Sequence, residues 1–414
     1  MKKIFLFFII VIIIVNITGC EINYSINNRN TSDNQNTSAI ASQGSQTSMP
    51  YAVTEPQITD KPQITPTPVP TVTSSVSSEP APEKEDIVIV AISAGENHAA
   101  AIDNRGVLYT WGQNESGQLG DGTTADRSEP KPVPGITNAK AVACGWLNTF
   151  VLSEDGLVYS FGEHFIARDY GDNTLPVAIK ELSDIIAIDT DGDSCIALKN
   201  DGTVYDWGLY SRSVSSEPEK VEELKDIVSV AAGLGYYLAV DRNGEVWTWG
   251  WSKYTDLDNS RGTGDTIGFP SKVRDIHNIK SACGKESEIL GIHYDGNVTR
   301  WGNYKKEILF DSNDVVSISA VYYHILAVKK DGTVFSWGSN IHGELGNRTK
   351  EDHYEPRIIG GLSGVIAAGA GVDFSMVLKE DGTVWAWGNN EYGQLGIGTT
   401  EDQLEPQQVK FPAN

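Results

Sequence analysis

An aromatic residue followed by glycine recurs seven times in this chain, and that recurrence constrains the fold more than any other feature. The pairs are Trp111-Gly112, Phe161-Gly162, Trp207-Gly208, Trp249-Gly250, Trp301-Gly302, Trp337-Gly338 and Trp387-Gly388, at a mean spacing of 46 residues. A glycine stands five positions before each aromatic, and in six repeats Asp or Asn precedes it. Asp-Gly or Asn-Gly between apolar runs predicts a two-residue hairpin turn with positive φ at both positions.

Each repeat has room for four strands. Two apolar runs precede the turn, one apolar run with an aromatic follows it, and a fourth stretch opens near a proline in six repeats. Those prolines are Pro132, Pro176, Pro218, Pro270, Pro356 and Pro406. Proline suits the edge of a sheet, so the fourth strand is expected to be outermost. Strands that are apolar on both faces need radial stacking, which predicts an all-β, seven-bladed β-propeller over residues 87–414.

A longer motif leads from the repeat to a known family. Repeat seven runs from Asp381-Gly382-Thr383-Val384 through Trp387-Gly388 to Gly393-Gln394-Leu395-Gly396, and repeats one and six carry Gly117-Gln118-Leu119-Gly120 and Gly343-Glu344-Leu345-Gly346. This pattern resembles the regulator of chromosome condensation repeat, whose members are seven-bladed propellers. The resemblance implies that function lies in loops displayed by the ring, because a shared fold does not fix a shared activity.

Family members do different things. The eukaryotic founder is a nucleotide exchange factor for a small nuclear GTPase and docks on chromatin, and plant relatives sense ultraviolet light through tryptophans in a repeated Gly-Trp-x-x-Thr context. That context occurs once here, at Gly145–Thr149. A secreted bacterial propeller of similar architecture inhibits β-lactamases. The resemblance therefore implies a binding function and leaves the bound partner open.

The first residues have the pattern of an export signal. Lys2 and Lys3 precede an apolar run over residues 4–15, and Ile17-Thr18-Gly19-Cys20 resembles a bacterial lipobox. We expect residues 1–19 to be a lipoprotein signal peptide and Cys20 to carry the lipid that holds the chain at the outer side of the cell membrane. An ordinary secretion signal with an incidental cysteine, or an uncleaved anchor, is the alternative.

Residues 20–86 have the composition of a tether. Ser, Thr, Asn, Gln and Pro dominate, and large apolar residues are almost absent. Such a segment cannot bury enough surface to offset its chain entropy, so it is predicted to be disordered. At about 5.5 Å times the square root of its length it would reach roughly 45 Å.

The acidic charge belongs mostly to the repeats. The chain has 32 Lys and Arg against 55 Asp and Glu, and residues 1–86 hold only 5 of the basic and 8 of the acidic side chains. Nucleic acid and anionic bilayers require clustered Lys and Arg. We therefore expect no nucleic-acid partner, membrane contact only through Cys20, and a monomeric ring that suits a neutral or basic macromolecule.

Catalytic and cofactor motifs were not found. The sequence has no His-Glu-x-x-His, no Gly-x-Ser-x-Gly and no phosphate-binding loop, so we predict no enzyme activity and no cofactor. His98 and His324 occupy equivalent repeat positions, and Cys144 and Cys283 near-equivalent ones, which indicates buried structural roles. Asp189, Asp191 and Asp193 alternate around a glycine, a pattern that suits calcium, although the run also falls where other repeats make a turn.

Divergence among the repeats predicts the binding residues. The loops after the aromatic-Gly pairs keep the Gly-Gln-Leu-Gly theme in repeats six, seven and one, whereas repeats two to five replace it. The replacements place aromatic or imidazole side chains in loops, where Tyr and Trp favour protein contacts: His164, Phe165, Tyr210, Trp251, Tyr254 and Tyr304. Trp146 belongs to a second cluster with Tyr236, Tyr237, Tyr322 and Tyr323. Drift, with these rings tucked onto blade edges, is the alternative.

The preferred hypothesis is a surface-anchored, non-catalytic propeller that binds an extracytoplasmic macromolecule. Three alternatives remain: inhibition of a secreted enzyme such as a β-lactamase, nucleotide-exchange activity by family descent, and cleavage of cell-wall glycan by carboxylates in the ring mouth. Recovery of a protein partner would favour the first hypothesis, and activity assays would separate the others.

Overall fold

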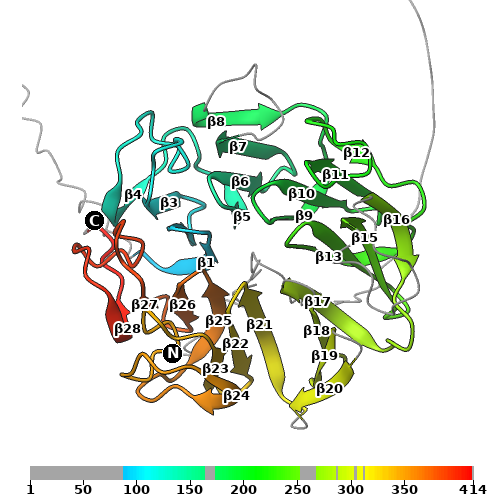
Figure 1. The fold of residues 1–414 in the computed structure, drawn as a ribbon. Coiled ribbons are helices and arrows are strands. Elements are labelled where there is room, and N and C mark those ends of the chain that lie inside the picture. Colours follow the sequence, from blue (N-terminus) through cyan, green and yellow to red (C-terminus); the bar gives the residue numbers. More distant parts are fainter. Residues whose placement is uncertain are drawn as a thin grey trace, which may run out of the picture. The chain divides into compact units, whose positions relative to one another are not determined.

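The computed structural model describes residues 87–163, 173–251, 267–285, 288–302, 305–310 and 313–412. These residues form seven antiparallel sheets of four strands each, arranged around a central axis (Figure 1). The predicted seven-bladed propeller is confirmed. The predictions for residues 1–86, including Cys20, lie outside the described residues.

Each blade is one continuous stretch of chain, with strands ordered from the axis outward. The innermost strands are β1 (Ile89–Ala94), β5 (Ala139–Cys144), β9 (Ile185–Thr190), β13 (Ile227–Gly233), β17 (Ile279–Lys285), β21 (Val315–Val321) and β25 (Val365–Ala370). The second strands are β2 (His98–Asp103), β6 (Asn148–Ser153), β10 (Ser194–Lys199), β14 (Tyr236–Asp241), β18 (Glu288–His293), β22 (His324–Lys329) and β26 (Phe374–Lys379).

The third strands carry the aromatic-Gly pairs. They are β3 (Leu108–Gly112), β7 (Val158–Gly162), β11 (Val204–Gly208), β15 (Val246–Trp251), β19 (Val298–Gly302), β23 (Val334–Gly338) and β27 (Val384–Gly388). The outermost strands are β4 (Arg127–Pro132), β8 (Asn173–Ile179), β12 (Glu219–Lys220), β16 (Ile267–Lys272), β20 (Lys305–Phe310), β24 (His353–Ile358) and β28 (Gln403–Gln408).

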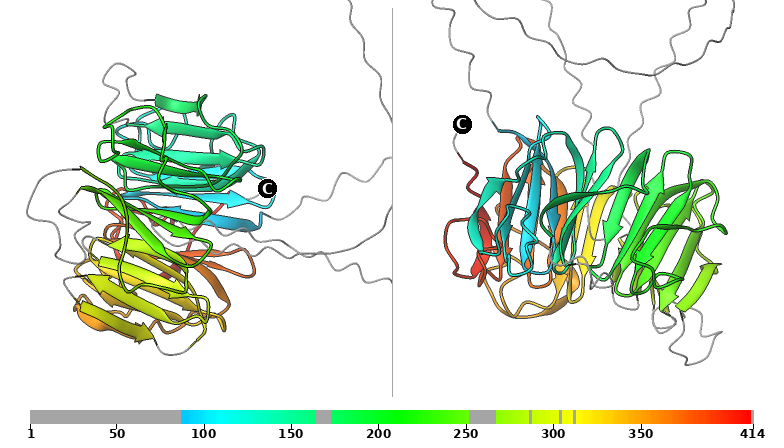
Figure 2. Two further views of the ribbon diagram at one scale, coloured as in Figure 1. Left: turned by 90° about the vertical axis from the view of Figure 1, so that its right-hand side faces the viewer. Right: turned by 90° about the horizontal axis from the view of Figure 1, so that it is seen from above.

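The ring has two different faces. Because neighbouring strands are antiparallel, the connections from first to second strand and from third to fourth strand emerge on the same side, which we call the loop face. The Asp-Gly turns and the links between blades emerge on the opposite side, the hairpin face (Figure 2). Backbone bonds join the two loops of a blade, including Gln113 N to Asn97 O, Trp251 N to Gly235 O and Ser339 N to Tyr323 O.

The turns on the hairpin face differ from the sequence prediction. In blade 1, Gly106 N bonds to Asp103 O and Asp103 N bonds to Val107 O, which leaves three residues in the loop. Only the glycine has positive φ, +78° at Gly106. This is a type I turn followed by a left-handed glycine, and it needs only one positive-φ residue. The preceding aspartate instead accepts a backbone N–H, as Asp381 does from Thr383 at 3.0 Å.

Except for Pro218, which directly precedes β12, the outer prolines lie within the fourth strand rather than at its start. Pro130, Pro176, Pro270, Pro356 and Pro406 are each the fourth residue of their strand, and Pro132 ends β4. The pairing of β24 with β23 and of β28 with β27 shifts register next to the proline. Proline has no N–H to donate, so it is tolerated where the ladder of an edge strand is already interrupted.

The aromatic-Gly residues fill the space between blades. Each of the seven aromatics is at most 6% exposed, and three indole N–H groups reach back to the preceding blade. Trp111 Nε1 donates to Gln394 O at 2.9 Å, Trp387 Nε1 to Glu344 O at 2.8 Å, and Trp249 Nε1 to Asp206 Oδ2 at 2.8 Å. Each of these three tryptophans therefore contributes a large apolar contact and fixes its position with one polar bond.

The ring closes by packing of blade 7 against blade 1, without exchange of a strand. Ile89 N bonds to Gly382 O at 3.2 Å, and strands β1 to β3 share one apolar cluster with β25 to β27. Phe411 completes the contact, with its ring edge-on to Tyr109 at 5.5 Å and to Trp111 at 5.9 Å.

Candidate functional site

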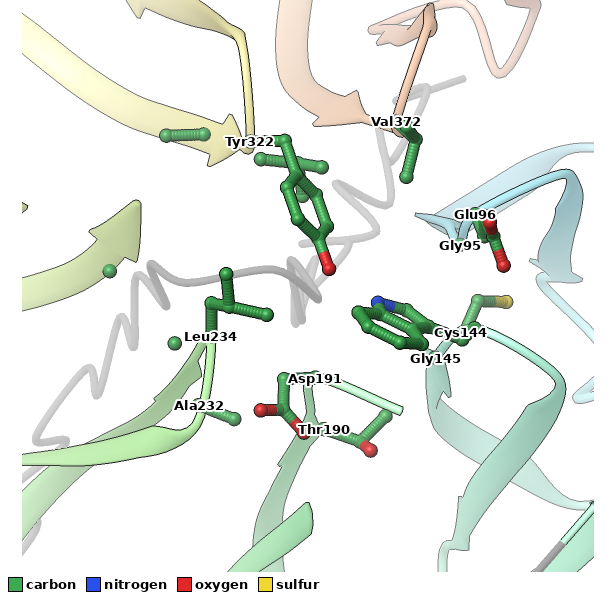
Figure 3. Close-up of a pocket in the computed structure, with 15 residues that line it drawn as sticks. Gly95, Glu96, Cys144, Gly145, Thr190, Asp191, Ala232, Leu234, Tyr322 and Val372 are labelled. Atoms are coloured by element: carbon green, nitrogen blue, oxygen red, sulfur yellow. The ribbon is translucent and has the colours of Figure 1, made fainter. Parts of the chain in front are cut away.

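The central channel opens on the loop face at a small, partly open hollow (Figure 3). All seven blades contribute to its wall, each through residues at or just beyond the end of its innermost strand. Equivalent positions carry very different side chains, among them Glu96, Trp146, Leu234, Tyr322 and Val372. The mouth of the channel is therefore where the repeats diverge around one shared space.

Trp146 and Tyr322 are aromatic neighbours at this mouth. They come from blades 2 and 6, and their ring centroids lie 5.9 Å apart with 36° between the planes. Trp146 lies against Gly192, where a Cβ would fall 2.7 Å from the indole Cγ. Tyr322 projects from β21 into the cavity with Leu234 and Asp191 around it (Figure 3). Its φ of +28° is unusual for a residue with a side chain.

Carboxylates surround the aromatic pair. Burial first, and then the charges of Asp191, Glu96 and Asp193, raise the pKa of the Tyr322 hydroxyl. The pKa of Glu96 is raised by burial and then by Glu115 and Asp373. Burial is the main cause of both shifts, and the neighbouring carboxylates raise each pKa further because a nearby negative charge disfavours a second one.

Asp191 and Asp193 belong to the run for which calcium was considered. Burial raises the pKa of Asp191 to about 7, and that of Asp193 to about 6. Asp191 Oδ2 accepts the Gly235 N–H at 2.7 Å, and its Oδ1 accepts those of Asp193 and Ser194 at 3.1 and 2.8 Å. One carboxylate thus holds its own turn and connects blade 3 to blade 4.

Asp189 repeats a bond found elsewhere in the ring. Its Oδ2 accepts the Ala232 N–H of blade 4 at 2.8 Å, just as Ser93 Oγ accepts from Cys144 and Ser319 Oγ from Ala370 at 3.0 Å. Among the described residues, no three His, Cys, Asp or Glu side chains are grouped to hold a metal ion. Asp189 and Asp191 therefore act as backbone acceptors between and within blades.

The structural roles predicted for the histidines and cysteines are confirmed. His98 Nε2 lies 2.8 Å from Thr149 Oγ1, and His324 Nε2 lies 2.9 Å from Ser375 Oγ, each bridging to the next blade. Burial lowers the pKa of His98 to about 3, so its ring is neutral. Cys144 and Cys283 are fully buried and unpaired by disulfides, although strand pairing places Cys283 one residue earlier in its strand than Cys144.

A second aromatic pair lies on the loop face near blades 3 and 4. Tyr210 follows β11 and Trp251 ends β15, and their rings stack at 5.7 Å with 12° between the planes. Both side chains are partly exposed. The structure therefore brings together two of the residues that the sequence singled out for partner binding.

The other predicted site residues divide into three groups. His164, Phe165, Tyr254 and Tyr304 lie outside the described residues. Tyr236 and Tyr237, grouped with Trp146 in the sequence, are buried in β14, where the Tyr236 hydroxyl donates to Glu288 O. Tyr322 does lie beside Trp146, and Tyr323, whose ring lies 5.6 Å from that of Tyr322, is 49% exposed. Glu96, Trp146 and Tyr322 occupy equivalent positions, two residues beyond β1 and β5 and one beyond β21. Comparison of the repeats at this position is the signal that would have found this mouth.

Two models of one repeat family match parts of the chain. The family model described as the regulator of chromosome condensation (RCC1) repeat matches residues 105–152, 331–378 and 381–414. A second model of the same repeat matches residues 89–118, 227–255, 315–344 and 365–394. Among the described residues, no helix is long and apolar enough to cross a membrane.

The curated relatives are mostly larger proteins. The ultraviolet-B receptor UVR8 of Arabidopsis thaliana is 29% identical over 297 residues, which cover 62% of this chain and 67% of the receptor. The E3 ubiquitin-protein ligase HERC2 of Mus musculus is 34% identical over 157 residues, 34% of this chain but only 3% of the ligase. The solved CRINKLY WD40 ectodomain of the Arabidopsis thaliana receptor kinase ACR4 is 13% identical with a TM-score of 0.51, covers 78% of this chain and all of that one, and shows the fold alone.

Proposed function

Because the chain is a seven-bladed propeller that carries regulator of chromosome condensation repeats, we propose that it is a non-catalytic protein-binding module anchored outside the cell membrane. The loop face binds an extracytoplasmic protein, and the Tyr210–Trp251 stack is its contact point near blades 3 and 4. The observation that carries this proposal is the placement of two diverged, partly exposed aromatics side by side on one face.

The chemistry of that pair suits a protein partner. Tyr and Trp offer large apolar area at low conformational cost, and they dominate the energetics of protein interfaces. Propellers of this repeat family are protein-interaction and regulatory folds. The stack follows the third strands of its blades, so a rigid sheet holds it in place, which limits the entropy lost on binding.

The proposed anchor and the geometry of the ring are compatible. Residue 87 leads into the start of β1, on the hairpin face, because that strand ends at the loop face. The acidic surface disfavours close contact with an anionic bilayer.

The anchor is tested by a single substitution. We expect the full chain to incorporate labelled fatty acid and to fractionate with membranes, and Cys20→Ser to abolish both because the acceptor thiol is lost. Inhibition of lipoprotein signal peptidase should leave a larger precursor. A Cys20→Ser protein that keeps its label and its membrane fraction would contradict the anchor.

The binding face is tested by crosslinking on intact cells that express the full chain. We expect a discrete crosslinked protein that is lost when Tyr210→Ala and Trp251→Ala are combined, because the stack supplies buried contact area. The control is Tyr354→Ala on the outer strand β24. It removes a tyrosine ring, as Tyr210→Ala does, but this ring is 71% exposed and lies away from the stack. Loss with Tyr354→Ala alone would place the contact on the rim and contradict the proposal.

A further inference from the structure

The mouth of the channel has the chemistry of a cation site. Its wall combines the Trp146–Tyr322 pair with the carboxylates of Glu96 and Asp191. No Lys or Arg lines the cavity among the described residues. A ring face attracts a cation through its quadrupole, and an adjacent carboxylate attracts the same charge directly.

The two carboxylates differ in how many hydrogen bonds they already accept. Asp191 already accepts three backbone N–H groups. Glu96 has no side-chain hydrogen bond or ion pair to another described residue, and Figure 3 shows it at the cavity edge. The pKa of Glu96 is raised by burial first, and then by the negative charges of Glu115 and Asp373. A cation that enters the mouth would relieve that repulsion.

The shape of the mouth selects a slender ligand. The Trp146 and Tyr322 rings lie 5.9 Å apart and contact each other, so an incoming group packs beside them and not between them. Small apolar side chains, Ala232, Ala320 and Val321, line the rest. An alkyl stem fits such a wall, and its charged end would then reach the carboxylates.

We propose that the channel mouth receives a lysine or arginine side chain of the protein partner, with its stem against Trp146 and Tyr322 and its charged end at Glu96. This inference rests on the proposed function, since it assigns a specific residue of the partner to a site on the same loop face. The net charge of −20 over the repeats would steer a basic segment toward this face.

The test is an isothermal calorimetric titration of the full chain with N-acetyl-arginine methylamide and with N-acetyl-lysine methylamide. The neutral probes are the corresponding citrulline and norleucine derivatives, which keep the stem and lack the charge. We expect a cationic probe to bind about five- to thirtyfold more tightly than its neutral counterpart, as an attraction of roughly 1–2 kcal/mol implies. Equal affinity of charged and neutral probes would overturn the proposal.

Variants locate the site. Glu96→Gln and Trp146→Leu should each weaken the cationic probe at least about threefold, because each removes part of one attraction. Glu391→Gln makes the same change of charge at an exposed loop-face position outside the cavity and should leave binding unchanged. Binding that survives Glu96→Gln, or that Glu391→Gln weakens equally, would overturn the site.

The outcome is separable from that of the proposed function. If the crosslinked partner is lost with the Tyr210 and Trp251 substitutions but no cationic probe binds, partner binding at the loop face is supported and the cation site is contradicted. If cationic probes bind as expected and no partner is crosslinked, the cation site stands as a property of the ring.

Discussion

At the scale of single residues, the central feature is a buried aspartate used as a structural acceptor. Asp191 occupies the position of Gly95 and Gly145 in other blades, and it bonds to the backbone of its own turn and of blade 4. Burying a carboxylate is costly, and these N–H donors offset part of that cost. The pKa of Asp191, raised to about 7, reflects what remains uncompensated.

The raised pKa predicts how stability depends on pH. An unfolded aspartate has a pKa near 3.9, whereas burial raises the pKa of folded Asp191 to about 7 and of Asp193 to about 6. Between about pH 4 and 7 the folded protein holds protons that the unfolded chain has lost. The contribution of these groups to the free energy of unfolding is therefore full below pH 4 and decreases as pH rises toward 7.

Urea denaturation of the full chain from pH 4 to 8 measures this slope. We expect Asp191→Asn to make it shallower, because the amide does not titrate. The amide oxygen replaces only one of the two accepting carboxylate oxygens, so the comparison uses the slope with pH and not the absolute free energy of unfolding. Asp381→Asn is the control, since hydrogen bonds to Thr383 lower the pKa of Asp381 and confine its titration to the acid side of this window. An unchanged slope in Asp191→Asn would contradict the assignment.

At the scale of elements, the Gly-Gln-Leu-Gly loops seal the gaps between particular blades. Gly120, Gly346 and Gly396 each face the aromatic-Gly residue of the following blade, namely Phe161, Trp387 and Trp111. At Gly396, φ is +67° and a Cβ would fall 2.7 Å from Trp111 Nε1. The motif that identifies the family thus allows close approach between neighbouring blades.

Substitution of Gly396 by alanine tests this role. Gly135 provides a matched control, because its φ is +80° and nothing lies within 4 Å of an added Cβ. Gly135→Ala should cost about 1 kcal/mol of unfolding free energy from backbone strain alone. Gly396→Ala should cost about 1–3 kcal/mol more, since the methyl group collides with the indole. Equal losses in denaturant unfolding would show that the loop tolerates the methyl group.

At the scale of the whole molecule, the ring depends on one closure between blades 7 and 1. A shared apolar cluster, the Ile89–Gly382 bond and the rings around Phe411 hold it. Each blade also buries its aromatic against a neighbour, so all seven interfaces contribute. We therefore expect the propeller to unfold as one cooperative unit.

Phe411→Ala should weaken the closure. The two edge-on contacts with Tyr109 and Trp111 would be lost, at a cost of about 1–3 kcal/mol in unfolding free energy. Phe269 on β16 is 67% exposed, so Phe269→Ala serves as the control and should be near neutral. If both substitutions cost the same in thermal and denaturant unfolding, Phe411 does not hold the ring.

How far the sequence predicts this structure varies with the kind of feature. The period of the aromatic-Gly pairs is enough to predict blade number, strand order and the buried role of His98, because each follows from position within a repeat. The turn type was predicted wrongly, since Asp-Gly also fits a three-residue loop in which only glycine takes positive φ. The Trp146–Tyr322 contact joins residues 176 positions apart, and its distance depends on the ring closing around both.

The contiguity of each blade has a consequence for how such a chain can change over generations. No blade borrows a strand from another, so a recombination event that copies or deletes one repeat adds or removes a finished unit without leaving an unpaired edge inside a sheet. The number of blades is then limited by the angle between neighbouring blades. The seven buried aromatics fill the space that this angle leaves. Sequence change is tolerated best in the loops, because the loop of one repeat can diverge while the strands of the other repeats keep the ring closed.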